Sequence, residues 1–323
     1  MKVARYVGNG KVSIVDESIP KCPPGGLLIK TQACGLCSGE LMDWYMDRKI
    51  PHVLGHEVAG LVVESESTGY QVGDRIFAHH HAPCMQCDMC RSQRYVQCPQ
   101  WKRTRLQPGG MAEFFAVDRE NLTDTFKVGE MRPQDAALIE PLACVIKSIR
   151  RGFGEELALP SDGNGCLVIG LGSLGIMHAL LLLGCAAIDL SPERVEYARS
   201  LGIDAKRSSD SPATRIFVCP GSTEALAVAV EMAAPDATIV LFAPAPPDRP
   251  YEIPQDAYFK DLKIVHSYSC GPSETTEAHR ILAQGAVDAK QVVSDFIGIN
   301  QIPRAYEQMK RGAILKAMVL FEE

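Results

Sequence analysis

Four cysteines stand close together in the segment CMQCDMCRSQRYVQC, at positions 84, 87, 90 and 98. Four thiolates can complete a tetrahedral shell around Zn²⁺, with Zn–S distances of about 2.3 Å. Two short spacers let three ligands come from one tight loop, and the longer spacer brings Cys98 back from the other side. Because such a shell leaves no coordination position open, we predict a structural zinc site formed by Cys84, Cys87, Cys90 and Cys98.

Disulfides and an iron–sulfur cluster are the alternatives for these cysteines. The segment MKVARYVGNGKVSIVDE has no apolar run behind its basic residues, so we expect no signal peptide and a cytoplasmic protein. Twelve cysteines in a reducing compartment are more often ligands, nucleophiles or core residues than disulfides. Two-cluster ferredoxins end their cysteine run with Cys-Pro after three residues, whereas Cys98-Pro99 follows seven. Zinc is therefore the favoured occupant.

A second set of possible metal ligands is spread along the chain. Cys37 lies in ACGLCSGE, His56 and Glu57 lie in VLGHEVAG, and Glu140 lies in IEPLA. Each has a simpler explanation when it is considered alone, because a buried cysteine is usually packed in a core. Core packing remains the alternative for Cys37 and His56. Together with the four-cysteine segment between them, however, these residues form a recognisable set.

A glycine motif stands between a predicted strand and a predicted helix. VIGLGSLG contains Gly170-x-Gly172-x-x-Gly175, and it follows the apolar run CLVIG. In this context the glycines permit a tight turn and the close approach of a pyrophosphate to the helix N-terminus. We therefore predict that Gly170, Gly172, Ser173, Leu174 and Gly175 contact a dinucleotide.

Asp189 ends the next predicted strand, nineteen residues after Gly170. A carboxylate at this position accepts hydrogen bonds from the adenosine ribose and repels a 2′-phosphate, which favours NAD over NADP. The alternative role of Asp189 is the N-cap of the following helix. Arg194 could stack on the adenine or tolerate a phosphate.

The hydrophobic pattern indicates two kinds of structure. Short alternating runs near 11–17, 26–33, 58–66 and 111–118 indicate a β-rich first part, and residues 133–151 are predicted to be helical. From residue 166 onward, buried-type strands alternate with helices, which is typical of a doubly wound parallel sheet. The last fifty residues add two helices and a final strand. We therefore expect an α/β protein with two domains.

The order of these motifs resembles one enzyme family. GLC, GHE, the four-cysteine segment, GGMAEF, EPLA and GLGSLG follow one another as in the zinc-dependent medium-chain dehydrogenase/reductase family, the alcohol dehydrogenase superfamily. The Glu-Pro pair resembles its sorbitol and threonine dehydrogenase branch. The resemblance implies a GroES-like catalytic domain from 1–145 and 271–323, and a Rossmann NAD-binding domain from 146–270.

The resemblance also implies the chemistry of the site. Cys37 and His56 would bind a catalytic zinc, and Glu57 and Glu140 would complete its shell directly or through water. The expected cofactors are two Zn²⁺ ions per chain and NAD. The expected reaction interconverts a secondary alcohol, of polyol, sugar or hydroxy-amino-acid type, with its carbonyl product by hydride transfer. Members of this family form homo-oligomers, so we expect a dimer or tetramer.

Three features depart from this resemblance. Gly39 stands where relatives have a proton-relaying Ser or Thr, and Met42 stands where many have a relay histidine. The segment from Gly175 to Asp189 is short, so a cofactor helix or strand must be shortened. The loop between Cys37 and His56 has only eighteen residues. A catalytically impaired member that binds cofactor is therefore the alternative function, and a zinc-independent reductase is a third one.

Some features carry less weight. Trp44 and Tyr45 could pack on a substrate, although ordinary packing explains them equally well. Three consecutive histidines precede the four-cysteine segment at 79–81, but neighbours on a strand face opposite ways, so we expect no metal site there. WKRTR at 101–105 is more simply a solvated loop than a substrate contact. The net charge of -6 argues against nucleic acids and anionic membranes as partners.

Overall fold

The computed structural model describes residues 1–154 and 163–322. Its contacts divide the chain into two units, unit 1 (Met1–Ala143 and Cys270–Glu323) and unit 2 (Cys144–Ser269). The boundaries predicted from the sequence are 145/146 and 270/271. The chain therefore passes from one unit to the other twice, after Ala143 and again after Ser269.

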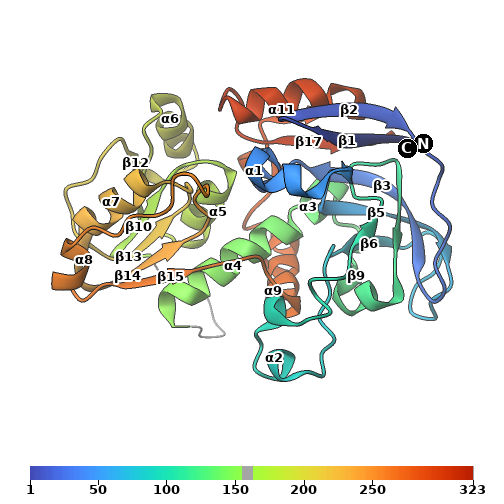
Figure 1. Ribbon diagram of the computed structural model, residues 1–323, viewed down its shortest axis with the longest axis horizontal. Coiled ribbons are helices and arrows are strands. Elements are labelled where there is room, and N and C mark those ends of the chain that lie inside the picture. The colour runs from blue at the N-terminus through green and yellow to red at the C-terminus, as the bar shows by residue number, and fades with distance from the viewer. Residues whose placement is uncertain (155–162, 323) are drawn as a thin grey trace. The chain divides into compact units, whose positions relative to one another are not determined.

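Among residues 144–154 and 163–269, unit 2 contains one sheet of six parallel strands in the order β12-β11-β10-β13-β14-β15 (Figure 1). The strands are Cys166–Ile169 (β10), Ala186–Ile188 (β11), Asp204–Lys206 (β12), Ala213–Val218 (β13), Ala233–Leu241 (β14) and Lys263–His266 (β15). The first strand lies in the centre, the next two lead outward, and the chain then returns to build the other half. This strand order is that of a Rossmann sheet, so the prediction of a doubly wound domain is confirmed.

Two of the helices in the described part of unit 2 begin at serine side chains that cap them. Between residues 163 and 269 the helices are Ser173–Leu181 (α5), Pro192–Ser200 (α6), Thr223–Met232 (α7) and Asp256–Phe259 (α8). Ser191 accepts a hydrogen bond from the Arg194 N–H at the start of α6, and Ser222 does the same for Ala225 at α7. The short segment after the glycine motif is accommodated by shortening two elements, because α5 has nine residues and β11 has three.

Unit 1 is built from strands, as predicted for the first part of the chain. They are Lys2–Gly8 (β1), Lys11–Asp16 (β2), Leu27–Gly35 (β3), His52–Val53 (β4), Glu57–Ser65 (β5), Arg75–Ala78 (β6), Leu106–Gln107 (β7), Phe114–Val117 (β8), Thr125–Lys127 (β9), Asp295–Ile297 (β16) and Ala317–Leu320 (β17). Among the described residues of unit 1, β2, β1 and β4 form a small sheet, and a larger sheet runs β16-β17-β3-β5-β6-β9. β8 pairs with β3, and β7 pairs with β8. Strand β3 is therefore central to unit 1.

Helices connect the strands of unit 1, and one of them, Ile139–Phe153, starts in unit 1 and continues into unit 2. The α-helices are Asp43–Met46 (α1), Asp88–Arg91 (α2), Pro133–Ala136 (α3), Ile139–Phe153 (α4), Pro272–Ala283 (α9), Ala289–Val292 (α10) and Ile302–Lys310 (α11). The 3-10 helices are Ser38–Leu41 (η1), Asp47–Lys49 (η2), Tyr95–Gln97 (η3), Arg119–Asp124 (η4) and Ile299–Gln301 (η5). The predicted helical region 133–151 is thus two helices. In the described part of the chain, no helix combines the length and apolar character needed to cross a bilayer.

The core of unit 1 joins distant parts of the sequence. Tyr6 and Phe115 from the first half pack in one apolar cluster with Ile302 and Tyr306 of α11, and all four are almost fully buried. The Tyr306 hydroxyl donates a hydrogen bond to the backbone oxygen of Glu40, at 2.8 Å. Strand β17 pairs with β3. The segment after unit 2 therefore completes the fold around residues 36–57.

Candidate active site

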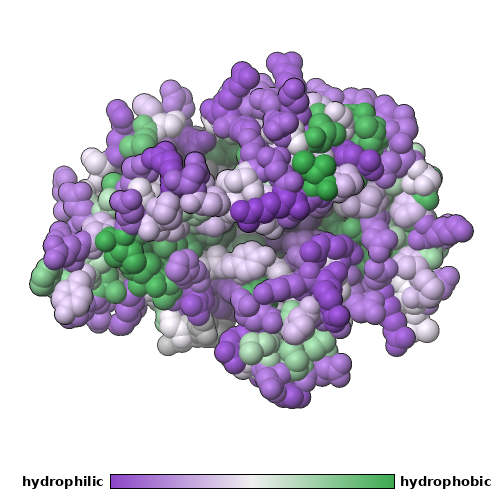
Figure 2. Space-filling view, viewed as in Figure 1, coloured by the Kyte–Doolittle hydropathy of each residue, from purple (hydrophilic) through white to green (hydrophobic). Residues whose placement is uncertain are grey.

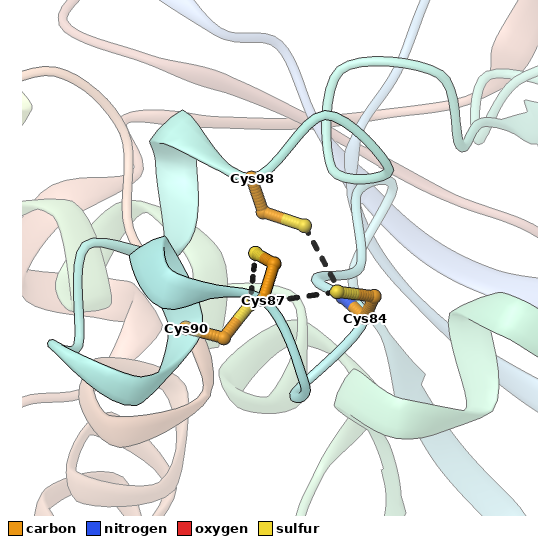
Figure 3. Close-up of side chains that lie close together, drawn as sticks. All are labelled: Cys84, Cys87, Cys90 and Cys98. Carbon is orange, nitrogen blue, oxygen red and sulfur yellow. Dashed lines mark hydrogen bonds between the residues drawn. The ribbon is translucent and has the colours of Figure 1, made fainter.

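The four cysteines of the predicted zinc site lie together in the loop around α2, with their side chains directed toward one another (Figure 3). The Cys87 and Cys90 sulfur atoms are 3.5 Å apart, and those of Cys84 and Cys90 are 3.9 Å apart. A tetrahedral shell with Zn–S distances of about 2.3 Å has sulfur–sulfur edges of about 3.8 Å. All four are free cysteines. The residues present therefore fit a closed Zn²⁺ shell.

Backbone N–H groups of this loop stabilise the thiolate form of its cysteines. Backbone N–H groups of Gln86 and Cys87 lower the pKa of Cys84 to about 6. The Cys84 N–H also donates to the Cys98 sulfur at 3.3 Å. Hydrogen bonds to a thiolate favour the charged form, which is the form that binds metal. Trp101 is buried and packs against the cysteines, so this part of WKRTR is a core residue and not a solvated one.

Cys37, His56 and Glu57 form a second group, with one ligand atom of each lying within 4.8 Å of the others. Cys37 caps the 3-10 helix η1, where its sulfur accepts a hydrogen bond from the Gly39 N–H. His56 precedes β5, and Glu57 is the first residue of that strand. A thiolate, an imidazole and a carboxylate with a position left open are the donor set of a catalytic zinc, so these residues fit that ion.

Glu40 fixes the orientation of His56. Its buried carboxylate lies 3.4 Å from His56 Nδ1 and accepts a hydrogen bond from the Gly55 N–H at 2.7 Å. A carboxylate on one ring nitrogen holds the other nitrogen free for a metal, as is typical of metal-ligating histidines. Glu40 is not among the site residues predicted from the sequence. Its spacing of three residues from Cys37 was the signal that could have identified its orienting role.

Lys316 of the loop before β17 reaches the same site, and the sequence analysis missed it. Its Nζ lies 2.5 Å from Glu57 Oε2 and donates to the Leu36 carbonyl oxygen at 3.2 Å. Both side chains are almost fully buried. A Cβ at Gly35 would lie 2.0 Å from the Glu57 carboxylate, so only glycine leaves room for this pair. Lys316 thus compensates the negative charge that Cys37 and Glu57 bring into the interior.

The pKa values of Cys37 and His56 depend on each other because the two side chains are neighbours. Burial raises the pKa of the Cys37 thiol, although the neighbouring His56 lowers it in part. Burial alone would lower the pKa of His56, but Cys37 and Glu40 raise it well above its usual value. Burial would raise the pKa of Glu40, yet His56 and the Gly55 N–H keep it below its ordinary value. A positive charge is therefore favoured between Cys37, His56 and Glu40. A bound metal ion would supply that charge in place of the proton on His56.

Glu140 does not belong to the group formed by Cys37, His56 and Glu57. It begins α4, and its carboxylate groups instead with His79 and Cys270 among the described residues. The charge of Glu140 still acts on Cys37, whose pKa it helps to raise, so the two side chains are neighbours. Coordination of the catalytic ion by Glu140, directly or through water, stays a prediction.

The three histidines follow strand β6, which ends at Ala78, and the ring centroids of His79 and His80 are 5.0 Å apart and those of His80 and His81 are 4.1 Å apart. The expectation that they face opposite ways is wrong, because they lie beyond the strand, where side chains need not alternate. His79 turns to Asp124, with 2.7 Å between Nδ1 and Oδ2. The His80 ring lies 4.7 Å from the His56 ring. The His81 ring lies 3.9 Å from the Trp101 ring. His80 is therefore a neighbour of the candidate catalytic site that the sequence analysis did not identify.

The loop between Cys37 and His56 contains side chains that pack against the core of unit 1 and side chains that are partly exposed. Tyr45 packs against the core of unit 1, while Lys49 lies over its ring with Nζ 3.8 Å from the centroid. Trp44 is half-buried and meets Tyr45 edge to face. Met42 is the N-cap residue of α1. Ordinary packing therefore accounts for Tyr45, and Trp44 packs on it.

The glycine motif has the geometry required of a nucleotide-binding loop. Gly170 has a φ of +92°, which favours glycine, and a Cβ at Gly175 would lie 1.8 Å from the Gly170 oxygen. A Cβ at Gly172 would meet nothing within 4 Å in the described residues. Helix α5 begins at Ser173, so the N–H groups of Ser173 and Leu174 lie at its N-terminus. The loop therefore offers free backbone donors beside an open space, as a pyrophosphate requires.

Asp189 follows β11, and its carboxylate lies against this loop. Its Oδ2 accepts a hydrogen bond from the Leu171 N–H at 2.6 Å, and its Oδ1 accepts one from the Ser191 N–H at 2.8 Å. Ser191, not Asp189, is the N-cap of α6, so the alternative role of Asp189 is wrong. Arg194 Nη1 lies 3.8 Å from Asp189 Oδ2. The ribose role of Asp189 and the adenine role of Arg194 stay predictions.

We expect Asp189→Ala to raise the Kd for NAD⁺ about 10-fold, since a hydrogen bond to a charged group is worth roughly 1.5–3 kcal/mol. Loss of the negative charge should also reduce the preference for NAD⁺ over NADP⁺. Titration calorimetry with both nucleotides measures these effects. Asp204→Ala, which removes an exposed aspartate from the neighbouring strand β12, is the control. Unchanged nucleotide preference in Asp189→Ala would exclude the ribose role.

Comparisons with known proteins agree with this arrangement. The sequence profile of the alcohol dehydrogenase GroES-like domain matches residues 23–127. D-altritol 5-dehydrogenase of Agrobacterium fabrum is 29% identical over 83% of this chain and 84% of its own length. L-threonine 3-dehydrogenase of Sinorhizobium medicae is 27% identical over 91% of each chain. The prediction of a GroES-like catalytic fold is confirmed.

Solved structures agree with the whole fold. Alcohol dehydrogenase TADH of Thermus sp. ATN1 is 24% identical, covers 100% of each chain and has a TM-score of 0.83. The predicted combination of a GroES-like unit and a Rossmann sheet is therefore found in one known architecture. With the motifs in this order and relatives of this kind, the chain is similar to the zinc-dependent medium-chain dehydrogenase/reductase family, and its residues 23–127 match the alcohol dehydrogenase GroES-like domain.

Proposed function

We propose that this protein is a zinc-containing, NAD-dependent dehydrogenase of secondary alcohols. The observation that carries the proposal is the incomplete ligand group of Cys37, His56 and Glu57, which leaves room for an oxygen ligand. Zn²⁺ bound there would supply a Lewis acid that lowers the pKa of the alcohol hydroxyl. NAD⁺ held at the glycine motif would accept the hydride. The chain therefore interconverts an alcohol with a ketone or aldehyde.

Each residue of the candidate site would have a distinct role in this reaction. Cys37, His56 and Glu57 provide the donor atoms, while Glu40 orients His56. Lys316 balances the buried charge of Glu57. Gly170, Gly172 and Gly175 shape the loop for a pyrophosphate, and the N–H groups at the start of α5 bind it. Asp189 would select NAD through the ribose.

The substrate class follows from the relatives. D-altritol 5-dehydrogenase and L-threonine 3-dehydrogenase are named for reactions at carbon 5 of a polyol and carbon 3 of an amino acid, which are secondary carbons. We therefore propose a polyol, sugar or hydroxy-amino acid as substrate. A panel of such compounds and simple secondary alcohols, tested with NAD⁺ and NADP⁺ by absorbance of the reduced nicotinamide, would identify it. Turnover that persists after Cys37→Ser would contradict the proposal.

The missing proton relay leads to a gain-of-function prediction. A Cβ at Gly39 would meet Cys37 Sγ at 3.5 Å, an ordinary contact among the described residues, so a hydroxyl side chain fits there. Because a positioned proton-transfer group contributes typically 10²–10⁴-fold, we expect Gly39→Ser to raise kcat at neutral pH by about 10-fold or more. Steady-state kinetics measures it, with Gly39→Ala as the control that adds bulk without a hydroxyl.

The result also decides between the active enzyme and the impaired one. If Gly39→Ser raises kcat above Gly39→Ala, proton transfer limits a working catalyst. If both variants and the natural chain bind NAD⁺ but none turns over any alcohol, the catalytically impaired member is the better description. A zinc-independent reductase would instead reduce its substrate after removal of metal.

The proposal extends to the assembly and location of the protein. Figure 2 shows hydrophobic side chains on the surface of unit 2. Two large side chains of α8 are exposed as well, Tyr258 by 79% and Phe259 by 73%. Among the described residues, strand β15 ends the order of the sheet, so its outer edge is available for pairing. These features support a homo-oligomer formed through unit 2. All twelve cysteines, each among the described residues, are free, which supports a reducing, cytoplasmic location.

A further inference from the structure

We propose that His79, Glu140 and Cys270 form a third zinc site, which fastens both connecting segments of the chain onto unit 1. One ligand atom of each residue lies within 4.8 Å of the others. His79 and Cys270 are fully buried, and Glu140 is 5% exposed. His79 directly follows β6, Glu140 lies in the first turn of α4, and Cys270 lies two residues before α9. This inference does not depend on the proposed function.

The donor atoms suit Zn²⁺. An imidazole nitrogen, a sulfur and a carboxylate oxygen are each among its common ligands. Cys270 Sγ lies 3.7 Å from His79 Nε2. In a tetrahedral shell with Zn–S of about 2.3 Å and Zn–N of about 2.0 Å, these two atoms would be about 3.5 Å apart. A carboxylate oxygen of Glu140 lies within 4.8 Å of both atoms, so the third ligand is within reach of the same ion.

The surroundings hold His79 in the orientation that a metal ligand needs. Its Nδ1 lies 2.7 Å from Asp124 Oδ2, and Asp124 Oδ1 accepts a hydrogen bond from the Thr275 hydroxyl at 2.6 Å. The His79 backbone oxygen accepts from the Asn121 amide at 2.9 Å. Nδ1 is thus engaged, and Nε2 points to Cys270. A carboxylate, a histidine and a metal in this order are the usual arrangement of zinc ligands and their supporting groups.

The cluster lies where the chain leaves unit 1 and where it returns to it. Glu140 lies three residues before the chain leaves unit 1 at Ala143, and Cys270 is the first residue after it returns. An ion shared by these two residues and His79 would cross-link both connecting segments to the end of β6. Because the ligands are buried, the site is structural and separate from the group of Cys37, His56 and Glu57. The inference makes Glu140 a ligand here and leaves three protein ligands at the catalytic ion.

Zinc content and anomalous scattering test the inference. The natural protein, purified with Zn²⁺ and dialysed without chelator, should contain three zinc ions per chain by mass spectrometry, and Cys270→Ser should contain two. Cys34→Ser is the control, because Cys34 is an equally buried cysteine of unit 1 outside all three groups. That variant should keep three ions. Equal zinc contents in Cys270→Ser and Cys34→Ser would overturn the site.

Crystals of the natural protein give an answer even if Cys270→Ser fails to fold. Diffraction data collected on both sides of the zinc absorption edge should show an anomalous peak between His79 Nε2, Cys270 Sγ and the Glu140 carboxylate. Peaks at the other two ligand groups serve as internal references. If those two groups hold zinc and no peak occurs at the third, the inference is wrong, while the proposed dehydrogenase function is unaffected.

Discussion

Replacement of Cys37 by serine is expected to lower kcat/KM for alcohol oxidation by about 10³-fold or more. Cys37 provides the sulfur of the incomplete ligand group, and loss of a Lewis-acid site costs several kcal/mol of transition-state stabilisation. Serine can still cap η1 where Cys37 now accepts from the Gly39 N–H, so the fold should persist. Steady-state kinetics, zinc content and thermal unfolding of the same preparation measure the three effects.

Cys22→Ser is the matched control for this prediction. Cys22 is also a partly exposed thiol of unit 1, and it lies outside the three groups of metal-ligating residues among the described positions. Its replacement should leave turnover and zinc content unchanged. If Cys37→Ser keeps its full zinc content and its activity, Cys37 is a core residue and the dehydrogenase chemistry proposed for this site is excluded.

A different outcome is expected for Cys98→Ser, which opens the closed shell in the four-cysteine loop. Binding of structural zinc is worth about 10–16 kcal/mol in small zinc domains, so losing even part of it should lower the melting temperature by about 10 °C. The folded fraction should retain turnover, because these cysteines form a group separate from Cys37. Differential scanning calorimetry and zinc analysis measure the change.

Cys34→Ser separates the effect of the metal from that of a buried hydroxyl. Cys34 and Cys98 are both fully buried, so both replacements place a polar atom in the interior. Only Cys98→Ser should lose a zinc ion, and addition of a chelator should lower the stability of the natural protein and Cys34→Ser toward that of Cys98→Ser. Identical behaviour of Cys37→Ser and Cys98→Ser would show that the two groups do not have separate roles.

The pattern of residues predicts the parts of the site that are contiguous or marked by glycine. The short spacers of Cys84, Cys87 and Cys90 confine three ligands to one loop, and the same is true of the turn from Gly170 to Gly175. Alternating strands and helices likewise predict the parallel sheet, because burial on both faces makes strand β10 wholly apolar. These features depend on local geometry, which a sequence records directly.

The contacts that the sequence could not predict are long-range contacts between ordinary residues. Lys316 and Glu57 meet because β17 pairs with β3, and β3 pairs in turn with β5. Cys270 meets His79 only after the chain has passed through the whole of unit 2. No spacing rule connects residues that far apart. Their partners follow from strand register and from the route of the chain between units, which only the folded structure reveals.

The interrupted course of unit 1 has a consequence for biosynthesis. Its β3 strand emerges early from the ribosome, but the neighbouring β17 strand and the lysine that neutralises Glu57 emerge only after all of unit 2. Until then the nascent chain carries an unpaired sheet edge and an uncompensated acid at the place where Cys37 and His56 meet. We therefore expect the catalytic ion to enter after translation of this segment, whereas the four-cysteine loop, being local, can be loaded while the chain is still growing.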